Sequence, residues 1–550
     1  MLCPTDTVCE RRGRALTCVP IAVGQQLVMR SILLSSSLLV SAVVVVGCPD
    51  ASPPPTETGA TMDTSVIIDD AGEAPALVCP GAKGCAAVEG RLHAGAGFRA
   101  ITPGFEQPVY LAGFDIGRTA TGTHDDVEAR AFVLERGDLR VGFVTVDTIG
   151  WYNHDAVRVR TAAAQLGLDL DHVVVSSTHN HESKDTMGIW GKNVSVTGYD
   201  ESYQQFVADQ AAAALGDAVD GLVPVTLTSA QTNDAKHLVN DTRAPYVRDD
   251  SLSILHFADD DGVGVATWVI WGNHPEALGS DNTLITSDYP RYVREELEAE
   301  LPGTTAVFTS GVLGGLTTTI GINVCPDADD ATIDTCPQGT FERAEVVGRE
   351  AGRLAVAALN DTGIVEPDFL SLKRLPFRVT PKTTTLILAF SLGLIPRPVF
   401  DRDGGQVPDD ELEFVTVEAM QAGEFQLVTE VNALRIGDVE VVTVPGELYA
   451  ELYMLDEEGG SLVERPENAD LPGGESEPSV GTQMPPSSMN VILNQTNDSL
   501  GYIIPQSQWD EDAPFAYEPD GQYGEQNSLG PQNAGDITRA IVDLYKLQLR

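Results

Sequence analysis

The stretch from Asp171 to His181 constrains this chain most, because it joins a buried-strand pattern to two closely spaced histidines. The run His-Val-Val-Val-Ser-Ser-Thr predicts a β-strand, since β-branched and small residues fit a pleated surface. His179 and His181 follow where this strand ends. Alternate residues of a strand point to the same face, so we expect both imidazoles in one cavity. Imidazole is a common zinc ligand, and the pattern favours a metal or catalytic site over polar residues that merely cap a strand.

Two other apolar runs also end in side chains that bind metals. One leads into Gly-Asn-His274-Pro, and the other leads into Val-Pro-Gly-Glu447. Taken alone, a structural role for His274 is an equal alternative, and a helix-start carboxylate is the simpler explanation of Glu447. Two histidines and one carboxylate suit catalytic zinc. The three strand endings together predict that His179, His274 and Glu447 converge on a shared cleft.

Length and composition limit the fold class and the partners. The chain has 550 residues, of which 42% are hydrophobic, so it can bury a large core. It carries 81 acidic and 34 basic residues, a net charge of −47, and no basic patch that would neutralise phosphates. We therefore expect no nucleic-acid partner. Strands and helices intermingle with several hairpins, which predicts an α/β fold with mixed β-sheets and flanking helices in one large catalytic domain over 87–550.

Local patterns predict individual elements of this domain. Hairpins are expected where two apolar runs flank a short polar turn, over 131–147, 252–272 and 425–444. Helices are expected over 154–168, 201–219, 292–301, 341–359 and 536–549. The apolar segment 386–395 has two equal interpretations. It is either a buried core segment or a surface that meets lipid or an acyl chain.

The N-terminal region predicts export. Residues 29–48 combine one positive charge, an apolar run and a small residue before Cys48, which is typical of a secretory signal. The sequence Val-Val-Gly-Cys48 resembles a bacterial lipobox, in which the cysteine becomes the lipidated first residue. A plain membrane anchor is the alternative, but the run is short for a spanning helix. We expect translation to start at Met29, with 1–28 as a mis-set start, and the protein to be lipid-anchored facing the periplasm or exterior.

The segment after the signal is expected to be a tether. Residues 49–86 are rich in Pro, Thr, Ala, Gly and Asp, a composition typical of flexible linkers. The cysteines beyond Cys48 form two close pairs, which are Cys79 with Cys85 and Cys325 with Cys336. Export implies an oxidising compartment, so two local disulfides are expected. Their spacing does not fit a zinc finger.

Five motifs resemble the neutral (non-lysosomal) ceramidases, in their N-terminal catalytic domain. They are Gly113–Phe132, Ser177-Thr-His-Asn-His181, Gly272-Asn-His-Pro275, Val444-Pro-Gly-Glu447 and Asn497-Asp-Ser-Leu-Gly-Tyr-Ile-Ile-Pro505. The resemblance extends from about residue 90 to the C-terminus. It implies one Zn²⁺ ion per chain, held by four side chains, His179, His274, Glu447 and Tyr502.

The same resemblance implies further site residues. His181 is expected beside the substrate carbonyl, and Arg243 is expected to help fix the substrate. A second tyrosine is either Tyr517 or Tyr523. We prefer Tyr523, because Tyr-Gly-Glu-Gln-Asn-Ser-Leu-Gly-Pro531 better matches the Tyr-to-Gly-Pro stretch of the family.

The chain also departs from the pattern of the family. Glu-Ser-Lys184 replaces the usual Ser-Gly-Pro after the histidine pair. In the loop Gly311–Thr319, Thr317 occupies the place of a serine once regarded as the nucleophile, and the proline of that loop is missing. No C-terminal immunoglobulin-like domain is expected. These departures bear on the substrate and leave the zinc positions intact.

The sequence therefore predicts a zinc-dependent amidase that cleaves ceramide or a related N-acyl lipid into a fatty acid and an amine. Water activated by zinc is expected as the nucleophile in place of Thr317. Two alternatives stay open. One is a different metallohydrolase, such as an amidohydrolase barrel, although the histidine pair lies late in the chain and no series of eight βα units follows. The other is a non-catalytic surface lipoprotein that binds lipid.

Overall fold

The computed structural model describes residues 7–12, 15–20, 90–327, 333–474, 476–519 and 521–546. The chain divides into two compact units, residues 1–63 and 64–550. In the first unit, β1 (Thr7–Arg12) pairs antiparallel with β2 (Ala15–Pro20). The expected signal peptide, the tether, Cys48, Cys79 and Cys85 lie outside the described residues.

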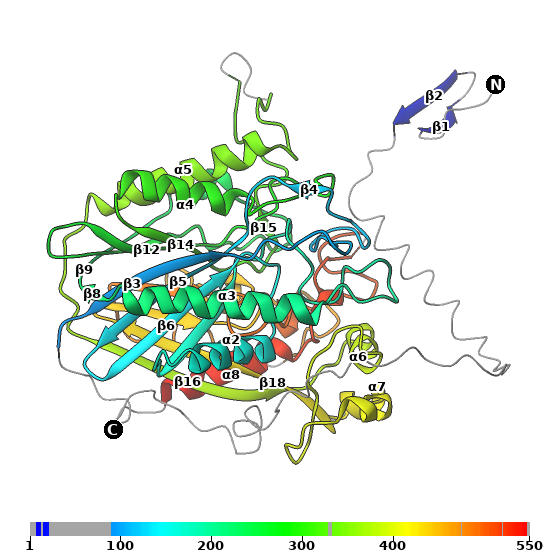
Figure 1. Cartoon of the computed structure of the whole chain (residues 1–550). Helices are drawn as coiled ribbons and strands as arrows, with labels where there is room; N and C mark the ends of the chain where they lie inside the picture. Colours follow the sequence, from blue (N-terminus) through cyan, green and yellow to red (C-terminus); the bar gives the residue numbers. More distant parts are fainter. Residues whose placement is uncertain are drawn as a thin grey trace. The chain divides into compact units, whose positions relative to one another are not determined.

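The second unit has the predicted α/β fold with mixed sheets, and its first sheet carries the strand before the histidine pair. The strand order is β7-β6-β5-β3-β8, with β6 and β7 parallel and the other pairs antiparallel. Its strands are β3 (His93–Ala100), β5 (Glu128–Arg136), β6 (Leu139–Val146), β7 (His172–Ser177) and β8 (Val223–Pro224). Helices α2 (Asn153–Gln165) and α3 (Glu201–Asp220) bury their alanine- and valine-rich faces against it (Figure 1).

A second sheet is covered by two helices that approach each other closely. Its order is β14-β12-β11-β9, with β12 and β14 parallel. Its strands are β9 (Thr226–Thr232), β11 (Leu252–Ala258), β12 (Gly264–Trp271) and β14 (Thr305–Ser310). Helices α4 (Tyr289–Glu300) and α5 (Phe341–Leu359) lie side by side on it (Figure 1). A Cβ on Gly348 would lie 2.4 Å from the Tyr289 carbonyl oxygen, so this crossing requires glycine.

A third sheet leads to the glutamate motif. Its order is β16-β18-β19-β21, and β19 and β21 are parallel. Its strands are β16 (Leu370–Val379), β18 (Phe425–Ile436), β19 (Val439–Thr443) and β21 (Met489–Leu493), with β17 (Phe400–Asp401) beside β18. Helix α8 (Asn533–Lys546) packs with this sheet, and α6 (Thr384–Ser391) and α7 (Val417–Gln421) lie together (Figure 1).

The three sheets share one apolar core. Phe132 stacks on Phe143 with ring centroids 4.7 Å apart, and Trp268 lies 5.1 Å from Phe132. Leu372 and Leu434 of the third sheet belong to the same buried cluster. Rings in such contact stabilise a core beyond their area burial. The sheets are open and separate, which excludes the amidohydrolase barrel as the fold of this unit.

Short ladders tie the loops beyond the sheets together. The pairs are β4 (Gly122–Thr123) with β13 (Leu284–Ile285), β10 (Asn240–Asp241) with β15 (Thr317–Thr318), and β20 (Glu447–Leu448) with β22 (Tyr502–Ile503). Short 3₁₀ turns are η2 (Asp234–Leu238), η3 (Asp409–Phe414), η4 (Ala450–Leu452), η5 (Gln506–Gln508) and η6 (Glu525–Asn527). Two of these ladders hold the loops that carry the candidate site.

The apolar segment 386–395 is partly buried in the core and partly exposed, so each of its two expected interpretations holds for some of its residues. It contains most of α6, whose Ile387 and Phe390 are buried in the core, while Leu388 and Leu392 are 46% and 70% exposed.

Cys325 and Cys336 form the expected disulfide, with Cα atoms 5.4 Å apart. Within the part of the chain that the structure describes, no helix is both long and apolar enough to cross a bilayer.

Candidate metal centre

His179 and His181 lie in the loop after β7 and not in the strand itself. The strand ends at Ser177, and His179 has a φ of 64°, in a region that non-glycine residues seldom occupy. Strand alternation was therefore the wrong reason for expecting the two rings together. Loop hydrogen bonds do this instead, from Asn180 N–H to the Thr148 carbonyl and from His181 N–H to the Pro275 carbonyl. The two imidazole centroids lie 5.0 Å apart.

His274 reaches the same place from the end of β12. Its ring centroid is 4.9 Å from that of His179 and 5.8 Å from that of His181. One ring nitrogen from each of these three histidines lies within 4.8 Å of the others. The carbonyl oxygen of Thr317 accepts from both the backbone N–H and the Nδ1 of His274, at 2.9 and 2.6 Å. These two hydrogen bonds fix the orientation of the ring.

Glu447 and Tyr502 enter together as partners in the parallel ladder of β20 and β22. The Glu447 carboxylate lies 3.1 Å from His274 Nε2 and 3.5 Å from His179 Nε2. The Tyr502 hydroxyl donates a hydrogen bond to the same carboxylate. The four residues expected to hold zinc are thus brought together, although they come from four separate segments.

The chemistry of this donor set fits a divalent metal. The Nδ1 atoms of His179 and His274 each lie 2.6 Å from a backbone carbonyl, which belongs to Ile149 and Thr317 respectively. A carbonyl only accepts, so each Nδ1 carries a proton and each Nε2 faces the Glu447 carboxylate. A metal ion between these atoms would be held by both Nε2 lone pairs and by the carboxylate. Carbonyl acceptors behind ligand histidines are the usual support of metal sites.

The pKa values of His179 and His274 shift in opposite directions. Burial lowers the pKa of His179 to about 4, against the opposing charge of Glu447. Burial acts to lower the pKa of His274, but the hydrogen bond and the charge of Glu447 outweigh it, and this pKa is raised. Burial acts to raise the pKa of the Glu447 carboxyl, but the two imidazoles and the Tyr502 hydroxyl outweigh it, and this pKa is lowered. A neutral imidazole and an ionised carboxylate are the states that bind metals.

Two of the expected site residues make other contacts. The Thr317 hydroxyl is buried and donates to the Leu313 carbonyl at 3.2 Å, so only the backbone of Thr317 serves the cavity. Arg243 is 1% exposed, and its guanidinium donates to Glu525 at 2.5 Å. The same guanidinium lies 4.8 Å from the ring centre of Tyr449. The Arg243 guanidinium therefore contacts Glu525 and Tyr449, and no contact between it and the three histidines is seen among the described residues.

The structure also separates the two candidate tyrosines. The Tyr523 ring lies 5.9 Å from the Tyr502 ring, beside the cavity. Burial and Glu464 raise the pKa of the Tyr517 hydroxyl while Arg243 lowers it, which places Tyr517 in the neighbourhood of Arg243. Of the two, Tyr523 is therefore the tyrosine whose ring lies beside Tyr502.

Glu276 is a site residue that sequence reasoning missed. Its Oε2 lies 3.5 Å from His181 Nδ1. It comes two residues after His274, so an acidic residue inside the Gly-Asn-His-Pro-Glu stretch was the available signal. Arg118 was also missed; it forms a buried ion pair with Glu182 and donates to the His181 carbonyl.

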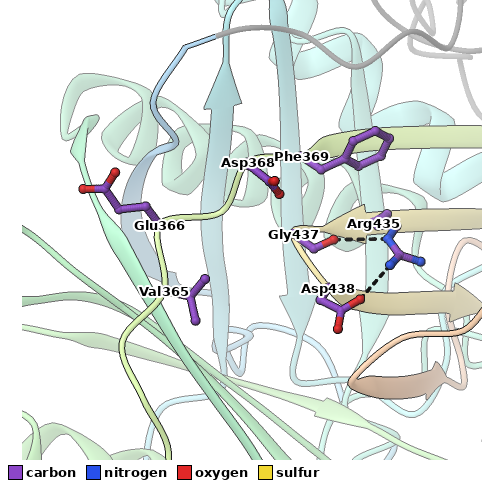
Figure 2. Close-up of a pocket in the computed structure, with 7 residues that line it drawn as sticks. All are labelled: Val365, Glu366, Asp368, Phe369, Arg435, Gly437 and Asp438. Atoms are coloured by element: carbon purple, nitrogen blue, oxygen red, sulfur yellow. Dashed lines mark hydrogen bonds and ion pairs between the residues drawn. The ribbon is translucent and has the colours of Figure 1, made fainter.

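A surface pocket elsewhere takes no part in this centre. Figure 2 shows its seven lining residues, Val365, Glu366, Asp368, Phe369, Arg435, Gly437 and Asp438. Its volume is about 490 Å³, and Arg435 spans it with hydrogen bonds to the Gly437 carbonyl and the Asp438 carboxylate. None of the expected site residues lines it.

Comparisons with known proteins find a sequence relative and structures of the same fold. No family model matches the chain. Neutral ceramidase of Drosophila melanogaster is 24% identical over 322 residues, which cover 50% of this chain and 45% of that protein. The match thus spans about half the length of the curated relative.

Two solved structures share the fold. The neutral ceramidase from Pseudomonas aeruginosa aligns with a TM-score of 0.58 and 16% identity, over 83% of this chain and 74% of that chain. A ceramidase complexed with C2 aligns with a TM-score of 0.57 and 19% identity, over 84% of this chain and 76% of that chain. The chain is thus similar in sequence to a neutral ceramidase over about half of its length and shares its fold with two ceramidase structures.

Proposed function

We propose that this chain is a zinc-dependent amidase that hydrolyses the N-acyl bond of ceramide or of a related N-acyl lipid. The observation that carries the proposal is the convergence of His179 Nε2 and His274 Nε2 on the Glu447 carboxylate. This donor set is typical of catalytic zinc. The similarity to neutral ceramidases supplies the substrate class.

His179, His274, Glu447 and Tyr502 would hold the ion. Zinc, when bound, supplies a Lewis acid that polarises the amide carbonyl and lowers the pKa of water to about 7. The chain itself places these ligands on loops braced by backbone carbonyls and by the ladder of β20 and β22.

The remaining residues bind the substrate and move protons. Hydrolysis adds water across the C–N bond, so the acyl carbon gains oxygen and the departing nitrogen gains a proton. Among the described residues, neither buried ring nitrogen of His181 has a hydrogen-bond partner, so the ring can offer a nitrogen to the reacting amide. The Tyr523 hydroxyl can stabilise the negative oxygen that develops on the carbonyl. Thr317 and Arg243 support this arrangement through the contacts described above.

The proposal includes export. Translation from Met29, cleavage before Cys48 and lipidation of that cysteine would anchor the enzyme to a membrane that presents its substrates. The observation that supports this is the signal and lipobox pattern of residues 29–48.

The direct test is metal analysis together with a hydrolysis screen on the purified protein expressed from Met29. We expect one zinc ion per chain and release of fatty acid from ceramides, with N-acyl amino acids as the comparison series. Removal of zinc by a chelator should abolish release, and added zinc should restore it. Hydrolysis confined to esters or to soluble amides would indicate a metallohydrolase of another substrate class. Lipid binding without any hydrolysis would identify a non-catalytic lipoprotein.

A further inference from the structure

The three histidines of the centre are supported in two different ways. His179 and His274 each have a backbone carbonyl 2.6 Å from Nδ1. His181 has no such support, and both of its ring nitrogens are buried without a hydrogen-bond partner among the described residues. A neutral imidazole exists in two tautomers, and the acceptor on one nitrogen decides which is present. The tautomer of His181 must be set by a side chain.

The apolar surroundings of His181 fix its plane without choosing its tautomer. Phe114 meets the ring edge-on with centroids 5.1 Å apart. A Cβ on Gly113 would lie 2.4 Å from His181 Cγ, so the backbone presses on the ring at this point. Arg118 donates to the backbone carbonyl of His181 and does not reach the ring nitrogens.

Glu276 is the carboxylate that faces the ring. Its Oε2 lies 3.5 Å from His181 Nδ1, and its side chain is only 14% exposed. The carboxylate is itself held in place, because the Thr318 hydroxyl donates to it and the Glu276 N–H donates to the His274 carbonyl at 2.9 Å. A catalytic hydrogen bond that is long in the free enzyme commonly tightens when substrate binds.

We propose that Glu276 is the positioning residue of His181. Its carboxylate accepts the proton on Nδ1, and this leaves Nε2 as the nitrogen available to the substrate. The role corresponds to the third member of a hydrolytic triad, which orients a base and holds its tautomer without touching substrate. Its effect on rate rests on the proposed amidase function, whereas its effect on the tautomer does not.

The tautomer can be measured without any activity. Protein labelled with ¹⁵N-histidine, held at one pH, gives two-bond ¹H–¹⁵N patterns that show which ring nitrogen carries the proton, and His181→Ala assigns the signal. We expect the proton on Nδ1 in the wild type and in Glu276→Gln, which keeps an acceptor oxygen. Glu276→Leu should give a mixture of tautomers, and Asp281→Leu, an exposed acid nearby, should change nothing. An unchanged tautomer in Glu276→Leu would overturn the proposal.

A double-mutant cycle tests the effect on rate. We expect Glu276→Leu to lower kcat by about 10–100-fold, the usual cost of losing such a supporting partner, with KM and zinc content unchanged. In the His181→Ala background the same substitution should have almost no further effect, because its target is gone. Glu276→Asp, which withdraws the carboxylate by one methylene, should lose an intermediate amount and serves if the leucine variant does not fold.

Two results of the cycle would contradict the role. Loss of zinc in Glu276→Leu would make Glu276 a ligand, and an additive loss in the His181→Ala background would make it independent of His181. A wild type that hydrolyses no N-acyl substrate would remove the proposed function, while the tautomer measurement would still decide the role of Glu276.

Discussion

The carbonyl oxygen of Thr317 holds His274 at two points, its backbone N–H at 2.9 Å and its Nδ1 at 2.6 Å. The hydroxyl of the same threonine donates a hydrogen bond to the Leu313 carbonyl and takes no part in holding His274. Thr317, which was expected to take the place of a serine, therefore contacts His274 through its main chain. A side-chain substitution at Thr317 removes the hydroxyl contact with Leu313 and keeps the carbonyl that holds His274.

We predict that Thr317→Ala retains most of the activity. The variant keeps the carbonyl that orients His274 and loses one buried hydroxyl contact, worth about 1 kcal/mol of stability. Steady-state hydrolysis and zinc content, measured beside the wild type, check this. An acyl-enzyme trapped on Thr317, or a variant as inactive as the ligand variants, would show that the hydroxyl is the nucleophile.

Loss of a ligand should remove both metal and activity. His179→Ala and Glu447→Ala should abolish hydrolysis and release zinc, because each takes away a donor that the others cannot replace. His181→Ala should keep the zinc and lose most of the rate, since its ring acts on the reacting groups. Metal analysis by mass spectrometry separates the two classes. Zinc retained at full occupancy in Glu447→Ala would exclude this ligand set.

We predict that loss of the Arg243 side chain lowers the free energy of unfolding more than it weakens substrate binding. Breaking its buried pair with Glu525 leaves one charge uncompensated, which typically costs about 3–5 kcal/mol. We expect urea unfolding to show this loss for Arg243→Leu, with a partial recovery in the double variant Arg243→Leu/Glu525→Leu. A stable Arg243→Leu protein with a raised KM would instead assign Arg243 to the substrate.

Acid should destabilise the fold partly through His172. Burial, helped by Arg160, lowers the pKa of His172 to about 4, although Glu430 acts against this. The unfolded chain binds its proton near pH 6.5, so the folded state holds fewer protons between these values. The stability that the neutral ring contributes is thus present above pH 6.5 and lost as the pH falls towards 4, on the order of 3 kcal/mol in total.

The matched variant isolates this contribution. His172→Gln cannot titrate, so its unfolding free energy should fall less than that of the wild type between pH 7.5 and 5. Both proteins share the metal centre, which cancels in the comparison. Identical pH slopes in the two proteins would exclude His172 as a source of acid sensitivity.

The mature N-terminus should be a modified Cys48. Mass spectrometry of membrane-extracted protein should find a lipidated cysteine as the first residue, and Cys48→Ser should leave the signal uncleaved or the protein unanchored. Detection of an intact Met1 in the exported protein would contradict both the start at Met29 and the anchor.

The local pattern of the sequence was sufficient for the longer helices and for three hairpins, but not for the shorter strands. The helix over 341–359 was predicted to the residue, because its apolar spacing is a local signal. The identities of His179, His274 and Glu447 followed from motifs at the ends of strands, and Tyr502 followed from the resemblance alone. Three similar strand endings predicted the convergence, but the order of the strands in the three sheets that produces it was not predicted.

Long-range contacts escaped prediction for a physical reason. The partner of Arg243 is Glu525, and nothing in the sequence around either residue indicates the other. Glu276 lies next to His181 only because the loops after β7 and β12 meet, with His181 N–H bonded to the Pro275 carbonyl. The positive φ of His179 is imposed by that same tertiary setting, against the preference of the residue itself.

The two-residue ladder of β20 and β22 would tie assembly of the proposed zinc site to completion of the chain. It joins Glu447 to Tyr502, and the other ligands lie hundreds of residues earlier in the sequence. No nascent or truncated fragment that stops short of β22 contains all four ligands. Zinc binding would therefore require the whole domain to be folded. Fragments released before β22 is synthesised would lack a complete ligand set and would be inactive.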